Sequence, residues 1–72
     1  MLIEHDYRGH RIQVDAVRSP TDAWDAEVRI RRVLTEDKPR VERVTCAKPD
    51  AELAERWGAI WARRWIEVNA TP

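Results

Sequence analysis

The chain has 72 residues, of which 13 are basic and 13 acidic, so its formal net charge is zero. We expect one domain over residues 1–72, and a domain this small buries only about 60% of the surface of its unfolded chain. The balanced charge argues against a general polyanion binder, which usually carries a clear basic excess. Core material is scarce at this length, so the four tryptophans are expected to supply much of it.

The single cysteine, Cys46, excludes an internal disulfide and is typical of a reducing compartment. The sequence shows neither a charged and then apolar leader nor an apolar run long enough to cross a membrane. It therefore predicts a cytoplasmic protein with no membrane partner.

The first strand is expected over 11–17, because Ile12, Val14 and Ala16 alternate with polar residues. A period of two is typical of a half-buried strand. The preceding residues 1–6 are mostly polar, and we expect them to fray.

The second strand is expected over 24–31, after a Ser-Pro-Thr-Asp turn at 19–22 that predicts a hairpin. Its inward residues are expected to be Trp24, Ala26, Val28 and Ile30, with Asp25, Glu27, Arg29 and Arg31 on the wet face. The alternation breaks after Arg31, which predicts a bulge or the strand end there.

The third strand, expected over 40–47, has the weakest pattern. Val41 and Val44 fall on opposite faces, and Val44 is in phase with Cys46. Its register stays open.

A helix is expected from Pro49 to about Val68, with Pro49 at its first position. At about 100° per residue, the large apolar side chains fall on one side, which predicts that they form the core. This face comprises Leu53, Trp57, Ile60, Trp61 and Val68, bordered by Ala54 and Trp65. Gly58 lies on its border, where close approach of a strand backbone would offset the helix-propensity cost of about 1 kcal/mol. The predicted fold is α+β: a three-stranded antiparallel sheet with one long C-terminal amphipathic helix packed on one face, β-β-β-α.

Residues that could carry chemistry are few. His5, Asp6, His10 and Cys46 could ligate a metal, but their spacing is no zinc signature, and nothing near Cys46 supplies an activating base. The chain has no phosphate-cradling glycine loop, paired-acid signature or triad motif. We therefore expect a protein that is not an enzyme, has no cofactor or metal, and has no evident small-molecule substrate.

Two surfaces are candidates for binding a partner. One is an interaction surface that includes Arg11, Gln13 and Trp65, although the outer face of the sheet could simply be solvated and self-compensating. The other is the basic second hairpin, which carries a local excess of cations diluted by Glu36, Asp37 and Glu42. Its possible nucleic-acid-binding residues are Arg29, Arg31, Arg32, Arg40 and Arg43.

The run Tyr7-Arg8-Gly9-His10-Arg11-Ile12, the polar turn, and Trp24-Asp25-Ala26-Glu27-Val28 before an alanine-rich helix are similar to the N-terminal half of HicB-type antitoxins. The plan resembles that of small uncharacterised bacterial β-β-β-α proteins, and its topology resembles double-stranded-RNA-binding domains. No functional residue is carried over from these families. We expect a small soluble bacterial protein that binds an unknown protein partner or forms a homodimer. The alternative is a weak nucleic-acid-binding module, double-stranded-RNA-binding-like or antitoxin-like, that uses the second hairpin.

Overall fold

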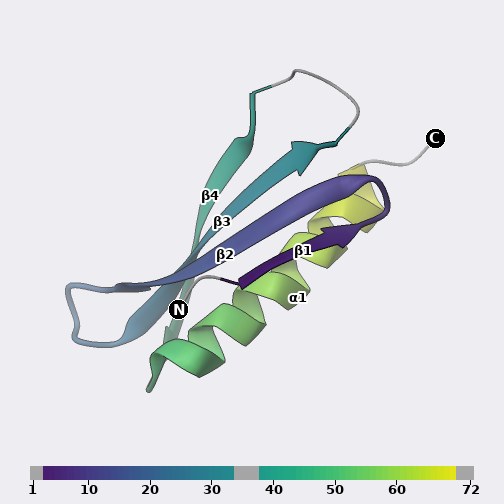
Figure 1. Ribbon diagram of the computed structural model, residues 1–72. Helices are drawn as coiled ribbons and strands as arrows, with labels where there is room; N and C mark the ends of the chain where they lie inside the picture. The colour runs from purple at the N-terminus through teal and green to yellow at the C-terminus, as the bar shows by residue number, and fades with distance from the viewer. Residues whose placement is uncertain (1–2, 34–37, 70–72) are drawn as a thin grey trace.

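A computed structural model describes residues 3–33 and 38–69, which form a two-layer α+β fold (Figure 1). The four strands form one antiparallel sheet in the order β1-β2-β3-β4, and helix α1 crosses one face, mainly over β2 and β3. The elements are β1 (Ile3–Tyr7), β2 (His10–Arg18), β3 (Trp24–Arg32), β4 (Arg40–Lys48) and α1 (Ala51–Asn69).

The sheet has four strands, so the prediction of three was wrong. Residues 3–6 of the segment expected to fray instead belong to β1, which pairs with β2 through a turn at Arg8 and Gly9, while residues 1 and 2 lie outside the described residues. Both turn residues have positive φ, 48° and 77°, as the type I′ turns of tight hairpins require. Glycine adopts this conformation without steric cost, and the twist of such a turn matches that of the paired strands.

In the other strands, most residues agree with the predicted patterns. Ala26, Val28 and Ile30 are buried, and β3 ends at Arg32, where the alternation breaks. In β4, Val44 is buried and Val41 is 49% exposed, so the two valines lie on opposite faces as expected. Trp24, by contrast, is only partly buried.

The β3–β4 ladder is irregular between Trp24 and Ala26, and this irregularity buries Asp25 rather than exposing it as predicted. The Asp25 carboxylate accepts hydrogen bonds from the backbone N–H groups of Cys46 and Ala47, at 3.1 and 3.0 Å. Ala47 has a φ of 48°, which removes its backbone from the regular ladder. Asp25 therefore binds backbone donors that the shifted register leaves without a strand partner.

We expect Asp25→Ala to lower the free energy of unfolding by about 1–3 kcal/mol, because it leaves two backbone donors without their acceptor. Asp25→Asn keeps a carbonyl oxygen at the site and should lose less. Urea unfolding of the two variants gives the comparison. Equal losses of unfolding free energy in the two variants would show that hydrogen-bond acceptance by the Asp25 side chain does not stabilise the irregular part of the ladder.

Helix α1 begins after Asp50, whose carboxylate accepts a hydrogen bond from the Leu53 N–H at 2.9 Å. This is the geometry of an N-cap. Pro49 therefore precedes the N-cap. The prediction that it occupies the first helical position was wrong. Asp50 is the better N-cap residue, because its carboxylate can accept a hydrogen bond from a free N–H group of the first helical turn. Proline has no side-chain acceptor for such a bond.

The orientation of α1 is the main departure from the sequence analysis. Most of the predicted core face points away from the sheet: Leu53 is 41% exposed, Trp57 45%, Ile60 51% and Val68 69%, whereas Trp61 and Trp65 are partly buried against the core. The residues that face the sheet are mostly small, namely Ala54, Glu55, Gly58, Ala59, Ala62 and Ile66.

Close approach of the helix to the sheet explains this orientation. A Cβ atom added at Gly58 would lie 2.7 Å from both Ala26 Cβ and Val14 Cγ1, so the helix touches the sheet where it has no side chain. The approach expected at Gly58 is thus present, but the atoms it meets belong to side chains rather than to a strand backbone. A sheet face of branched residues fills the space, leaving no room for indole rings beneath the helix axis.

Candidate interaction surface

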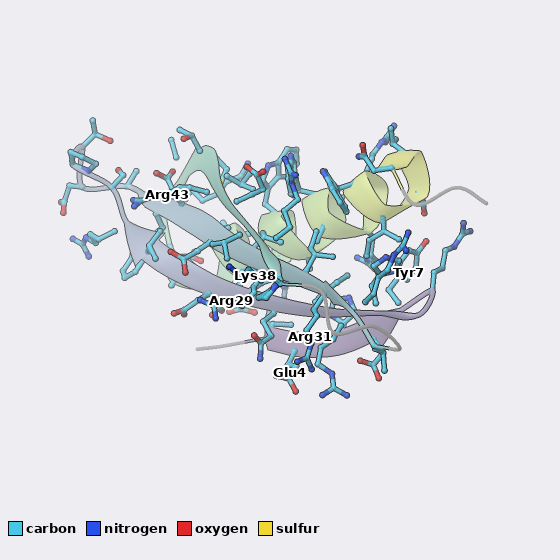
Figure 2. All side chains as sticks on the ribbon, turned by 90° about the horizontal axis from the view of Figure 1, so that it is seen from above. Glu4, Tyr7, Arg29, Arg31, Lys38 and Arg43 are labelled. Atoms are coloured by element: carbon cyan, nitrogen blue, oxygen red, sulfur yellow. The ribbon has the colours of Figure 1, made fainter. Side chains whose placement is uncertain are left out.

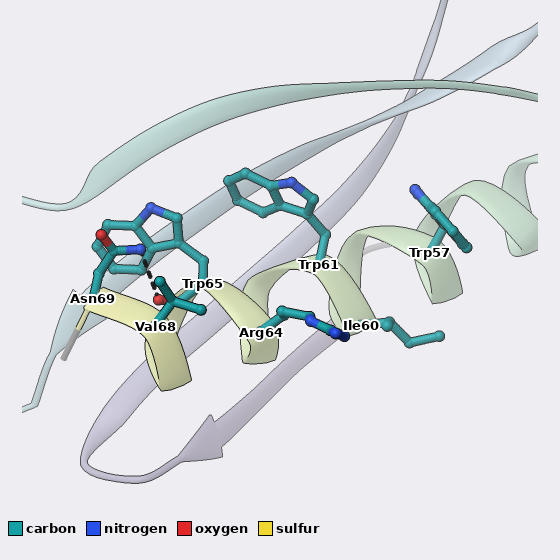
Figure 3. Close-up of a pocket in the computed structure, with 7 residues that line it drawn as sticks. All are labelled: Trp57, Ile60, Trp61, Arg64, Trp65, Val68 and Asn69. Atoms are coloured by element: carbon teal, nitrogen blue, oxygen red, sulfur yellow. Dashed lines mark hydrogen bonds between the residues drawn. The ribbon is translucent and has the colours of Figure 1, made fainter. Parts of the chain in front are cut away.

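The outward side of α1 carries a row of large apolar residues, which we call the tryptophan face: Leu53, Trp57, Ile60, Trp61, Trp65 and Val68. Most of these residues line a shallow groove of about 420 Å³ together with Arg64 and Asn69 (Figure 3). Their spacing of three and four residues places them along one side of the helix. The sequence predicted this grouping correctly, but assigned it to the core.

The indole rings are held in place by the sheet edge beside them. Trp61 and Trp65 are partly buried and pack against the core. Two cations from β4 lie over rings of the helix: Arg40 is 5.3 Å from the centroid of Trp65, and Lys48 is 4.6 Å from that of Trp57. Cation–π contacts of this kind attract the two rings to β4, and Trp57 remains 45% exposed.

The opposite flank of α1 is polar. Tyr7 of β1 donates a hydrogen bond to the Glu67 carboxylate, and this bond raises the pKa of the Tyr7 hydroxyl. Arg56 pairs with Glu52 one turn earlier, at 2.7 Å. The helix therefore has a small-residue side on the sheet, a charged side towards β1, and an apolar side that faces outward and borders β4.

The predicted interaction residues do not form one surface. Arg11 and Gln13 lie on the outer face of the sheet, where Arg11 pairs with Asp6 at 3.1 Å and Gln13 donates to Glu4 at 2.6 Å. Trp65 lies on the helix side. The outer face is thus at least partly self-compensating, which was the other reading of its charge pattern.

The predicted basic residues are divided between the two faces of the sheet. Arg29 and Arg31 lie on the side away from α1 (Figure 2), and by strand alternation Arg43 lies on that side too, 3.9 Å from the Asp25 carboxylate. On the other side, Arg32 and Arg40 line a hollow with Trp65. Three of the five arginines therefore share the outer face.

The metal-ligand candidates are also separated. His5 and His10 lie on the helix-covered face of β1 and β2, whereas the side chain of Asp6 points to the outer face and Cys46 is on β4. Within residues 3–33 and 38–69, no three His, Cys, Asp or Glu side chains are grouped as a metal site needs. Nδ1 of the His10 ring instead forms a hydrogen bond with the Arg8 carbonyl oxygen at 2.9 Å.

Cys46 is placed as a structural thiol. Its Sγ donates to the Trp24 carbonyl at 3.6 Å. Burial, and then the negative charge of Asp25, raise the pKa of the thiol above its ordinary value. Less of the nucleophilic thiolate is therefore present at neutral pH than in a free cysteine.

We expect iodoacetamide to alkylate Cys46 more slowly than a free thiol at about pH 7, with a rate that rises as the pH is raised. The chain unfolded in urea is the matched control, because it has the same thiol without burial. Mass spectrometry follows the reaction. Equal rates for the folded and unfolded chain at neutral pH would contradict this placement.

No helix in the described part of the chain is long and apolar enough to span a membrane. No family model, curated protein or solved structure matches this chain.

Proposed function

We propose that this protein is a non-enzymatic, self-associating module whose tryptophan face binds a second copy of the chain. The observation that carries the proposal is the exposure of large apolar residues in one row on α1. Contiguous apolar patches are uncommon on monomeric proteins and usually mark an interaction site. The exposed fractions of Trp57, Ile60 and Val68, between 45% and 69%, are large for residues of this type on one helix face.

Three properties favour a second copy as the occupant. The zero net charge removes the general repulsion between identical chains. A linear apolar row can pair with itself about a two-fold axis, which is the commonest symmetry of homo-oligomers. A domain of this size also gains stability from dimerisation, because its own core buries little surface.

Sedimentation equilibrium over a wide concentration range tests the proposal. We expect the mass of the wild-type protein to rise towards twice the chain mass, and Ile60→Glu to remain monomeric because a carboxylate would be buried in the interface. Val41→Glu is the matched control, since Val41 is similarly exposed at 49% but lies on the outer face of the sheet.

Monomeric wild-type protein at every concentration would overturn the proposal. So would equal association of the Ile60→Glu variant and the wild type. Loss of association in both glutamate variants would show that the effect is not specific to the tryptophan face.

A second candidate function is weak nucleic-acid binding by the outer face of the sheet. Arg11 and Arg31 are directly opposite on β2 and β3, and like charges in that position are unfavourable without a counter-ion. They line a hollow of about 190 Å³ with Gln13, Arg29 and Pro39. A phosphate in this hollow would relieve the repulsion, although Asp6 already neutralises part of it.

Titration with short duplex RNA and DNA at two salt concentrations tests this candidate. We expect an affinity that falls with salt and is lost in Arg29→Glu plus Arg31→Glu. The matched control is Arg56→Glu plus Arg63→Glu, which makes the same charge change on the helix. Absence of binding, or an equal loss of affinity in the two double variants, would exclude the outer face as a nucleic-acid-binding site.

A further inference from the structure

The tryptophan face has a charged residue within it, and its position is informative. Arg64 lines the groove among apolar side chains, and it has no ion-pair partner among the described residues. It lies two helical turns after Trp57, on the outward side of α1 (Figure 3). An interface that covers this groove must therefore provide an interaction partner for the guanidinium of Arg64.

The face contains a partner suitable for that group. One side of the Trp57 ring is already occupied by Lys48, at 4.6 Å, which shows that the ring accepts cations. Arg64 and Trp57 cannot meet on one helix, because residues seven apart are about 10 Å apart along the axis. They can meet between two helices that run in opposite directions.

We infer that two copies pack through antiparallel α1 helices, with Arg64 of each copy over the Trp57 ring of the other; the inference rests on the proposed self-association. In this register Ile60 lies beside Trp61 of the second copy, next to the two-fold axis. The two ends of the row, Leu53 and Val68, then cover each other. The antiparallel arrangement also opposes the two helix dipoles favourably.

Neighbouring registers are less complete. Sliding each helix by two residues in one direction places Arg64 over Trp61 and leaves Leu53 without an apolar partner. Sliding by the same amount in the other direction places Arg64 against Leu53 and leaves Val68 uncovered. Since Leu53 is 41% and Val68 69% exposed, the register that covers both buries the most apolar surface.

Cysteine cross-linking in a Cys46→Ser background tests the register. We expect a disulfide when Leu53→Cys and Val68→Cys proteins are mixed, and none when either is oxidised alone, since like positions are about 22 Å apart along the antiparallel pair. Mixed Trp57→Cys and Val68→Cys proteins should not cross-link. A disulfide from Leu53→Cys alone would show parallel helices, and one from the Trp57→Cys mixture would show the shifted register.

Two neighbouring arginines test the contact itself. Each dimer has two Arg64–Trp57 contacts, so Arg64→Gln should weaken dimerisation by about five- to thirtyfold. Arg63→Gln removes the same charge from the flank towards β1 and should change the dissociation constant by less than about twofold. Equal weakening by both variants would overturn the contact. A monomeric wild-type protein would instead overturn the proposed function, whereas a dimer with other cross-links would overturn this register alone.

Discussion

Ile66→Ala is expected to lower the free energy of unfolding by about 2–5 kcal/mol, the range for truncating a fully buried isoleucine. Ile66 is 1% exposed and packs in the core beneath α1. Removing three carbons there loses their burial and leaves a cavity in a domain with little other core. Few single substitutions in this chain should cost more.

Ile60→Ala is the matched control, because the same residue type on the same helix is 51% exposed. It should cost less than about 1 kcal/mol when unfolding is measured at a concentration where the protein is monomeric. Urea denaturation of both variants gives the values. If Ile60→Ala were the more destabilising of the two, the helix would face the sheet with its tryptophan side, as the sequence analysis predicted.

Gly58→Leu is expected to lower the free energy of unfolding by about 3 kcal/mol, the upper part of the range for overpacking a core. Its Cβ alone would lie 2.7 Å from Ala26 Cβ and Val14 Cγ1, and the remaining carbons would push the helix off the sheet. The gain in helix propensity over glycine, about 1 kcal/mol, does not offset this displacement.

Arg63→Leu places the same side chain at an exposed position of the same helix and should change stability little. Thermal unfolding followed by circular dichroism compares the two. A Gly58→Leu protein as stable as the wild type would mean that α1 does not approach the sheet at Gly58.

The strands could be predicted because one face of the sheet is covered and the other is open. That asymmetry places apolar residues at every second position, and β2 and β3 follow the pattern, whereas in β4 only Val44 is buried. In β1 the same alternation runs through Ile3, His5 and Tyr7. It was not recognised in the sequence, because the middle inward residue is a histidine rather than an apolar residue. The positive φ of Arg8 in the turn also has no strong signal in its residue type.

The orientation of α1 could not be predicted from hydrophobicity, because most of its large apolar residues are exposed and its buried residues, apart from Ile66, are small or charged. Burial here is set by how closely the helix can approach the sheet. The useful signal is the row of small residues four apart, Ala54, Gly58 and Ala62, which continues to Ile66. A row of this kind permits close packing, whereas indole rings fit only at the flank.

The candidate site could not be predicted for the same reason, namely the unexpected orientation of α1. The tryptophan face was visible as a grouping in the sequence, but a row of apolar residues on a helix is normally its core side. Only the position of the small residues in the structure shows that the row is left exposed. Arg29 and Arg31 of the second hairpin could be assigned to the outer face from the alternation of their own strand. Arg40 and Arg43 could not, because the register of the following strand stayed open.

A dilution series of ¹⁵N-labelled protein, observed at the four tryptophan indole N–H signals, tests the proposed self-association most directly. We predict that the signals of Trp57, Trp61 and Trp65 move with concentration, because all three line the groove. Trp24 does not line it and should stay in place. Four signals that remain unchanged over the whole range, or a shift confined to Trp24, would contradict binding of a second copy through the tryptophan face.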